Sequence, residues 1–488
     1  PSQRSPINFG SIEQIAVKVA PASVEYAQFR GGVIDIITKG GTNDFTGDFA
    51  YFDRGDSLMG DKLEGEDVDI TKEDTAYELA FGGPVIKDKL FFYVTYSEAE
   101  ISNPLRYGIQ GSGAENLLDV TADQAEQVRS AIQTLIGIDP FGPTGATESS
   151  QENTSVRLDW NINDKNRLTF NHKDVFGTDL RGSSSGRDTV ALYSARYIKS
   201  EETTTNSFHL VSDISDNLIS EVYFSTKETM TDQISPAGQN MPNITIDEAF
   251  GYEFVAGPDI FRMANDLDTE TTFFKAKLTY YQNDHKVTAG FENSEYDTYN
   301  VFIVDEDGSY EFDDLAAVQS GSFSSYSAAG TKTGNVADGA ADFQYELQSM
   351  YIMDEYSMSD TVTLTFGLRH DEYSGDDTPT NTSFLNTYGF KNGGIKGTDL
   401  TTYRFGADII LDDLSDLNVT YGTYSAKLPN VWISNAYTNT GTLTANYDSD
   451  FGNCPSTGQF SDFSFSGSNT KPDCVIASIS DPANVSGK

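Results

Sequence analysis

The sequence of 488 residues predicts an all-β fold, namely an antiparallel β-barrel that spans a membrane. Segments of about ten residues alternate between apolar and polar side chains, as a strand with two different faces requires. The connections between these segments alternate strictly between long and short. The chain also contains 31 Phe and 26 Tyr residues, which is far more aromatic surface than a disordered acidic chain carries.

The alternation is clearest in residues 155–162, where Val156 and Trp160 belong to an apolar face and Arg157 and Asp159 to a polar face. We expect the apolar face to meet lipid and the polar face to meet the lumen. A shift by one residue would turn Arg157 into lipid at a cost of about 2–4 kcal/mol near the midplane, so the register is well determined. Strands are expected at 45–52, 76–82, 89–98, 154–162, 166–176, 204–214, 218–228, 271–281, 285–299, 343–356, 361–372, 402–411 and 417–425.

The long connections all fall at one end of the expected strands. Outer-membrane barrels have this asymmetry, with short periplasmic turns and long extracellular loops, whereas a soluble β-sandwich has no reason for it. One long loop is expected to carry a helix over 121–137, with Thr121 and Gln124 as a capping box and Gly137 as the C-cap. The long connections are 53–75, 99–153, 177–203, 229–270, 300–342, 373–401 and the residues after 425.

The barrel is expected to be incomplete in this chain. Thirteen expected strands is an odd number, whereas single-chain bacterial barrels have an even number. The sequence also ends inside a long polar segment without a closing strand. Residues 1–43 differ from the rest, because a short apolar stretch lies there between two glycine pairs, which indicate tight turns or close backbone contacts. These glycines are Gly31, Gly32, Gly40 and Gly41.

The formal net charge of −42, from 74 acidic and 32 basic residues, argues against nucleic acid as a partner. No run of about 18 apolar residues occurs, so no transmembrane helix is expected. The acidic first loop is interpreted as a solvated surface, or as a site for divalent cations shared with lipopolysaccharide.

No cofactor and no metal site is predicted, except that calcium in the acidic extracellular loops stays open. In residues 305–308, of sequence DEDG, the glycine is fourth, whereas an EF-hand loop needs it sixth. The four histidines lie on separate expected strands, without metal-ligand spacing. No hydrolase, metalloprotease or phosphate-loop motif occurs, so we expect no enzyme.

Four residues near the C-terminus are further candidates. Cys454 and Cys474 share a polar, glycine- and serine-rich segment, which predicts a loop disulfide in an oxidising compartment. Trp432 and Tyr437 lie in the last long loop, where they would contact a substrate or belong to the outer aromatic girdle of a barrel.

Two stretches carry a resemblance to a known family. The stretch EYAQFRGGVIDIITKGGTNDFTGDFAYF at 25–52 resembles the junction between plug and barrel in TonB-dependent outer-membrane receptors. It is most similar to the Oar-like, OmpA-related subgroup, although Ala27 replaces a usual glycine and Asp35 a usual asparagine. The stretch FGGPVIKDKLFFYVTY at 81–96 resembles the first periplasmic turn and third strand of that subgroup.

The resemblance implies a barrel of about 22 strands, closed by an N-terminal plug and powered by the TonB–ExbB–ExbD complex. Residues 1–43 would be the C-terminal part of the plug, and 44–488 an incomplete barrel with extracellular loops. The short TonB-contacting box would lie upstream. Arg30 is similar to plug arginines that pair with carboxylates on the inner wall, and the alternative is a solvated arginine in the lumen. Arg30 and the glycine pairs would form the seam between plug and barrel.

The function implied is that of a receptor or transporter in the bacterial outer membrane, which captures a substrate at its loops and passes it through a plug-gated barrel. A surface-displayed structural or adhesin-like barrel is the alternative, and Oar-like export of proteins or peptides is another. Lipid, lipopolysaccharide and a surface lipoprotein or other outer-membrane protein are the further partners expected.

Overall fold

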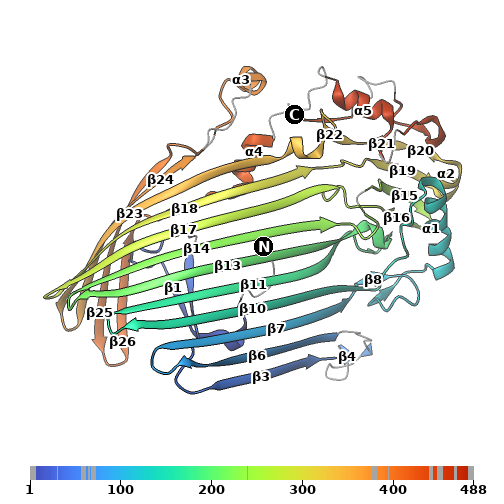
Figure 1. Ribbon diagram of the computed structural model, residues 1–488. Helices are drawn as coiled ribbons and strands as arrows, with labels where there is room; N and C mark the ends of the chain where they lie inside the picture. Colours follow the sequence, from blue (N-terminus) through green and yellow to red (C-terminus); the bar gives the residue numbers. More distant parts are fainter. Residues whose placement is uncertain are drawn as a thin grey trace.

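The wall of the molecule is a single antiparallel sheet of thirteen strands, strongly curved around a concave inner face (Figure 1). The computed structural model describes residues 7–29, 31–55, 62–63, 66–67, 73–238, 240–375, 382–393, 395–438, 443–447, 454–465 and 470–481. The wall strands are β3 (Thr46–Arg54), β6 (Glu73–Ile86), β7 (Leu90–Pro104), β10 (Ala146–Asn163), β11 (Asn166–Gly182), β13 (Arg196–Ser215), β14 (Leu218–Ile234), β17 (Ala264–Gln282), β18 (His285–Ile303), β23 (Ala341–Ser359), β24 (Val362–Gly375), β25 (Asp399–Asp412) and β26 (Ser415–Gly422).

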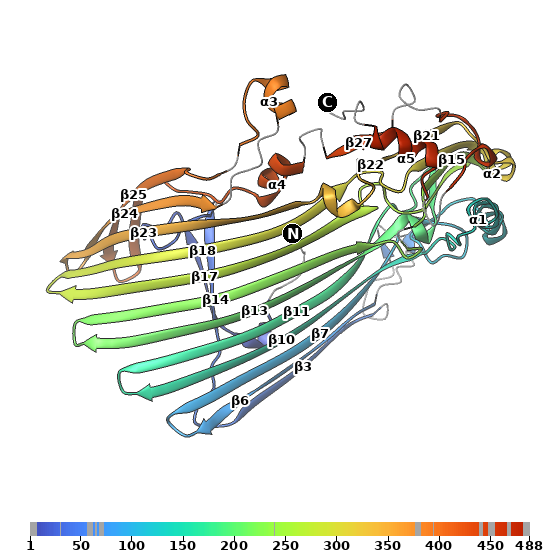
Figure 2. The same cartoon turned by 45° about the horizontal axis from the view of Figure 1, so that its top comes forward.

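Each wall strand pairs with its neighbours in the chain, and the described sheet has two edges, β3 and β26, so it is not closed (Figure 2). A strand lies at every predicted position. Most strands extend further toward the long loops than predicted, because their outer halves are rich in Thr, Ser and Glu and lack an apolar face. A membrane-spanning strand needs only about 9–11 residues. Since β13 has 20 residues, the wall extends well beyond the lipid.

The two faces of the wall follow the predicted alternation. Trp160, Leu368 and Tyr403 are 42%, 50% and 49% exposed on the outer face. Arg369 and Arg404, one residue further along their strands, are buried on the inner face, at 1% and 2% exposed. The short turns join strand pairs at one end only, as in the two-residue turn between β10 and β11.

At the other end, the long loops fold together into a cap with a hydrophobic core of its own. Val128, Ile246, Phe312 and Val475, from four different connections, are buried together in this core. Its elements include β8 (Tyr107–Gly108), β9 (Asn116–Leu117), α1 (Ala122–Ile136), β12 (Thr189–Ala191), η3 (Tyr193–Ala195), β15 (Asn243–Ala249), β16 (Tyr252–Ala256), β19 (Ser309–Asp314), α2 (Leu315–Ser320), β20 (Ser322–Phe323), β21 (Ser325–Ser327), β22 (Ala329–Thr331), η4 (Val336–Gly339), β27 (Thr444–Asn446), β28 (Gly458–Gln459), η5 (Phe460–Asp462) and α5 (Asp473–Ser480).

Helix α1 forms where the sequence predicts it. The Thr121 side chain and Gln124 make the capping box, and Gly137 ends the helix in the left-handed conformation at φ 77°. Ala125, Val128 and Ile132 bury one face of the helix in the cap. The remaining short elements are β4 (Lys62–Leu63), β5 (Glu66–Asp67), α3 (Thr382–Tyr388) and α4 (Asn430–Thr438).

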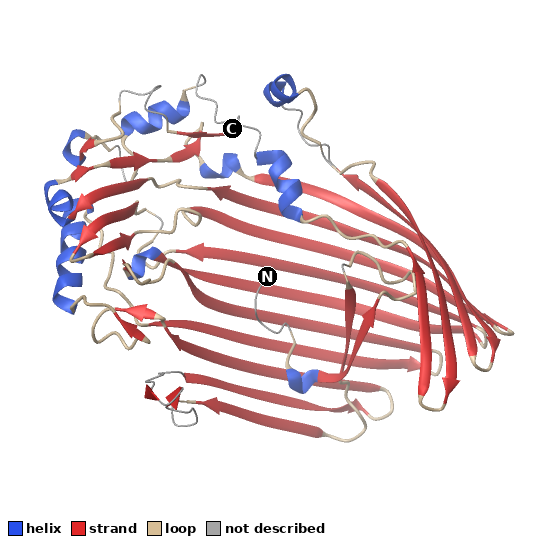
Figure 3. Cartoon of the chain, turned by 180° about the vertical axis from the view of Figure 1, so that it is seen from behind, coloured by secondary structure: helices blue, strands red, loops and turns tan. Residues whose placement is uncertain are grey.

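The N-terminal segment lies on the concave side of the wall (Figure 3). It contains η1 (Phe9–Ser11) and an antiparallel hairpin of β1 (Ile12–Val19) and β2 (Gly32–Thr38), which does not join the large sheet. Among the described residues, no helix has the length and apolar character to cross a membrane.

Candidate functional site

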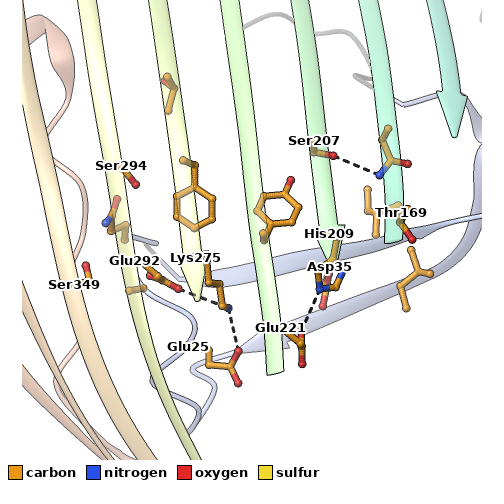
Figure 4. Close-up of a pocket in the computed structure, with 18 of the residues that line it drawn as sticks. Glu25, Asp35, Thr169, Ser207, His209, Glu221, Lys275, Glu292, Ser294 and Ser349 are labelled. Atoms are coloured by element: carbon orange, nitrogen blue, oxygen red, sulfur yellow. Dashed lines mark hydrogen bonds and ion pairs between the residues drawn. The ribbon is translucent and has the colours of Figure 1, made fainter. Parts of the chain in front are cut away.

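The candidate site is a cavity of about 990 Å³ between the N-terminal segment and the inner wall (Figure 4). The segment contributes residues from the connection between β1 and β2, including Glu25, and from β2, including Asp35. The wall contributes side chains from β10 to β24, most of them polar or charged. Apolar groups such as Ile36 and Phe273 also line the cavity, so it can accommodate polar solutes that carry some apolar surface.

Glu25 attaches the segment to the middle of the wall. Its carboxylate lies 3.1 Å from Lys275 Nζ and 3.4 Å from Lys277 Nζ, both on β17. Each lysine has a second partner on the wall, since Lys277 lies 2.7 Å from Glu221 and Lys275 lies 3.6 Å from Glu292. Figure 4 shows Glu25 and Lys275 pointing toward each other across the cavity floor.

Arg369 extends this network to β24. Its guanidinium lies 2.8 Å from Glu292 and 2.7 Å from Asp371, and it donates a 3.4 Å hydrogen bond to the carbonyl of Val24. Val24 is itself fully buried against Gly367, where a Cβ would come within 2.5 Å of a Val24 methyl group. The absence of a side chain at Gly367 therefore makes the pocket that holds Val24.

The neighbouring strand β25 holds the preceding residues of the segment. Arg404 donates to the carbonyls of Pro21, at 3.4 Å, and Ser23. Its guanidinium lies 4.4 Å from the centre of the Tyr424 ring, and the Tyr424 hydroxyl donates to the carbonyl of Ala20 at 3.2 Å. These hydrogen bonds hold the backbone of the segment, and its Phe29 ring also packs on the wall side, with 5.6 Å between the ring centres of Phe29 and Tyr424.

The end of β2 is held by β10. Arg157 donates a 2.6 Å hydrogen bond to the carbonyl of Thr38, and Asp159 orients the same guanidinium at 2.8 Å. Gly40 passes close to this pair, because a Cβ there would lie 2.8 Å from the Asp159 carboxylate. At Gly41 a Cβ would lie 2.3 Å from a backbone carbonyl of β7, so the chain passes the wall at a distance that only glycine permits.

The predicted seam residues thus have different positions. Gly40 and Gly41 touch the wall, whereas Gly32 pairs within the hairpin and Gly31 forms the turn before it, at φ 91°. Arg30 lies outside the described residues. The charges observed at the seam have the opposite arrangement to the one predicted for Arg30, because the segment supplies a carboxylate and the wall supplies the cations.

Sequence reasoning missed Glu25, Lys275, Lys277, Arg369 and Arg404. The two-residue alternation predicts Arg369 and Arg404 on the inner face of their strands, and it could have placed Lys275 and Lys277 there as well. It could not have paired them with Glu25, because that contact depends on where the segment crosses the wall.

The predicted aromatic candidates lie on α4 and are not equivalent. The Tyr437 ring stacks on Phe343 of β23, with 4.9 Å between ring centres, and so packs on the inner wall. Trp432 is 59% exposed. Cys454 and Cys474 form a disulfide with 5.4 Å between their Cα atoms, and both pack in the cap.

The acidic turn at 305–308 is already supplied with protein partners. Asp305 accepts a hydrogen bond from Ser327 at 2.6 Å, Glu306 pairs with Lys471, and Asp307 accepts from Thr470 at 3.1 Å. Burial, together with the Glu306 carboxylate, raises the pKa of Asp307 to about 7. In the part of the chain that the structure describes, no three potential metal-ligating side chains gather at one place. Most of the acidic first loop lies outside the described residues.

The family model of the outer membrane beta barrel domain matches residues 114–452, which is more than half of the chain. The chain belongs to this family. It is therefore an outer-membrane protein, and the resemblance to TonB-dependent receptors is confirmed. The TonB-dependent transporter Oar of Myxococcus xanthus is 26% identical over 141 residues, which cover 25% of this chain and 13% of Oar.

Solved structures share the fold at low sequence identity. The outer-membrane transporter YddB from Escherichia coli has a TM-score of 0.57 at 10% identity, over 86% of this chain and 48% of that one. A mutant of the ferric enterobactin receptor PfeA from Pseudomonas aeruginosa has a TM-score of 0.52 at 15% identity, over 86% and 49%. The chain thus spans about half the length of these structures. These relatives are named as transporters and receptors, not as enzymes.

Proposed function

We propose that the chain forms the C-terminal part of a plug (residues 1–43) and part of the barrel (44–488) of a TonB-dependent transporter. In this proposal the extracellular loops capture a substrate, and the TonB–ExbB–ExbD complex drives the plug segment to open the lumen.

The observation that carries the proposal is the way the segment is held. Its links to the wall include Glu25 with two lysines, and backbone carbonyls that accept from Arg157, Arg369 and Arg404. Val24 is buried against Gly367, and the Asn8 side chain donates to Thr95 at 3.0 Å and accepts from Ser97 at 2.6 Å. The Glu25 pairs are partly exposed to the cavity, and pairs of this kind contribute about 0–1 kcal/mol each. A segment held by a few such links can be displaced by an energy source without unfolding the barrel.

The hairpin itself supports the assignment to a plug. Ile15, Val17, Val19 and Ile34 are each more than half exposed, although their apolar side chains are on a short two-stranded sheet. An isolated hairpin of this kind is marginally stable, so we infer that further plug residues pack against this face.

The test uses the full-length protein in its own outer membrane. Ala22 packs directly against Gly406 of the wall, so an Ala22→Cys variant reports whether the segment is docked. We expect a membrane-impermeant maleimide to label this cysteine faster in energised cells than in cells treated with an uncoupler or lacking TonB.

The control places the reporter on the wall, as a Ser225→Cys variant on the inner face of β14, whose labelling should not depend on energy. Labelling of Ala22→Cys that is equally slow in all cells would refute the transporter and favour a static surface barrel. Faster labelling that depends on the presence of a secreted protein cargo, and that does not depend on any solute in the medium, would favour export.

A further inference from the structure

A row of inner-face residues crosses the wall just above the cavity, on the side of the long loops. Each member is directly opposite the next in the strand register, so the row runs straight across seven neighbouring strands. We call it the lysine row, and it consists of Ser155, Lys173, Thr205, Lys227, Thr271, Tyr296 and Tyr345.

The lysine row faces the lumen. Thr271 and Tyr296 line the cavity, and residues directly opposite each other in a sheet share a face. Lys173 and Lys227 lie two strands apart, with only Thr205 between them. Neighbouring strands are about 4.8 Å apart, so the Cα atoms of the two lysines are separated by about 10 Å.

A third lysine reaches the row from the segment after β26. The ammonium group of Lys427 lies 3.4 Å from the centre of the Tyr296 ring and 5.9 Å from that of Tyr345. Burial and the positive charge of Lys227 lower the pKa of Lys427 to about 8. Tyr296 lies two strands from Lys227 in the lysine row, with Thr271 between them, so Lys427 joins the row on the side of Lys227.

Among the described residues these three lysines have no counterion, although the chain has 74 acidic residues. Lys173, Lys227 and Lys427 make no ion pair with any residue that the structure describes. The next row toward the periplasm consists of Arg157, Asn171, Ser207, Ser225, Phe273, Ser294 and Leu347. The next row toward the loops consists of Asn153, Val175, Thr203, Thr229, Thr269, Thr298 and Phe343.

No row of these three contains a carboxylate, and most of their side chains are hydroxyls or amides. Glu228 and Glu270 lie at the same level of the wall. Each is next in sequence to an inward-facing residue, so its own side chain lies on the outer face. The carboxylates that line the cavity below are already paired, as Glu25 is with Lys275 and Asp35 is with Lys18 at 3.1 Å. The positive charge of the lysine row is thus available to a ligand.

We propose that Lys173, Lys227 and Lys427 form a binding subsite for an anionic solute with two or more carboxylate or phosphate groups. The separation of the lysines fits a ligand with anionic groups at both ends, and the surrounding Thr, Ser and Asn side chains can donate to its remaining oxygens. This inference rests on the proposed function and deepens it, because it assigns the chemical class of the solute that the transporter would carry.

The test is isothermal titration calorimetry on the full-length protein in detergent, with citrate and tripolyphosphate as the carboxylate and phosphate probes and sucrose as the neutral control. We expect one or both anions to bind, with an affinity that falls as salt rises. Lys173→Gln and Lys227→Gln should each weaken binding about tenfold or more, because each removes a charge-assisted hydrogen bond. Lys227→Arg should keep most of the affinity.

The matched control is Lys165→Gln, which makes the same change of charge in the exposed turn between β10 and β11. It should bind as the wild type does. Affinity should also decline as the pH rises above about 8, where Lys427 loses its proton. Absence of binding by both anions at millimolar concentration, or an equal effect of Lys165→Gln and Lys227→Gln, would overturn the proposal.

Failure of this subsite and failure of the transporter are distinguishable. Binding is measured on purified protein without an energy source, whereas plug movement is measured in cells. Binding that persists while Ala22→Cys labelling is independent of energy would refute the transporter alone. Energy-dependent labelling in a protein that binds neither anion would refute the subsite alone.

Discussion

Glu25 is a side chain through which the N-terminal segment forms ion pairs with the barrel wall. Replacing it by Gln keeps its size and removes the charge that faces Lys275 and Lys277. If the docked segment depends on this link, Glu25→Gln should shift the equilibrium toward an undocked segment while leaving the wall intact.

The size of the shift in the docking equilibrium follows from the ion pairs that the two lysines retain in Glu25→Gln. Lys277 keeps Glu221 at 2.7 Å and Lys275 keeps Glu292 at 3.6 Å, so neither charge is stranded. Leaving a buried charge unpaired typically costs about 3–5 kcal/mol. The loss of docking free energy in Glu25→Gln should be smaller, about 1–2 kcal/mol, because it removes two partly exposed ion pairs. That free energy corresponds to about a 5- to 30-fold change in the docking equilibrium.

Hydrogen exchange followed by mass spectrometry measures this equilibrium in the purified protein. Amides of residues 20–29 should exchange about 5 to 30 times faster in Glu25→Gln, whereas amides of β13 and β14 should be unchanged. Glu13→Gln is the control, because Glu13 is exposed on β1 of the same segment. Equal exchange in the two variants would show that the ion pairs do not hold the segment.

Three further predictions concern the seam and the cap. Gly41→Ala should lower the free energy of unfolding by about 1–3 kcal/mol, because the added Cβ would clash with the backbone of the wall. Gly55→Ala, which has open space around it, is the control and should leave the free energy of unfolding unchanged. Ile132→Ala should cost about 2–5 kcal/mol of cap stability and speed proteolysis of the loops but not of the wall, and Leu117→Ala, an exposed site, is its control. Because the pKa of Asp307 is raised to about 7, its contribution to cap stability is fully present below about pH 4 and is lost as the pH rises through about 7. Asp307→Asn should therefore slow thermolysin cleavage of residues 454–481 relative to wild type at pH 8, and much less so at pH 5.

The wall could be predicted because its information is local. In 155–162 the alternation of Arg157 and Asp159 with Val156 and Trp160 is enforced by the pleat and by the cost of placing charge in lipid. The same locality explains α1, whose cap residues and apolar face lie within one short stretch. The outer halves of the strands were not predicted, since above the lipid both faces meet water and the alternation disappears.

By itself, the sequence determined the membrane barrel, the register of its strands, the end at which its loops lie and the helix in the first cap loop. Only the tertiary structure decided that Glu25 meets Lys275, that Val24 fits over Gly367 and that Lys427 lies over the Tyr296 ring. The physical reason is separation along the chain, because a side-chain pattern reports which face a residue occupies but not which distant residue the curvature of the wall brings against it.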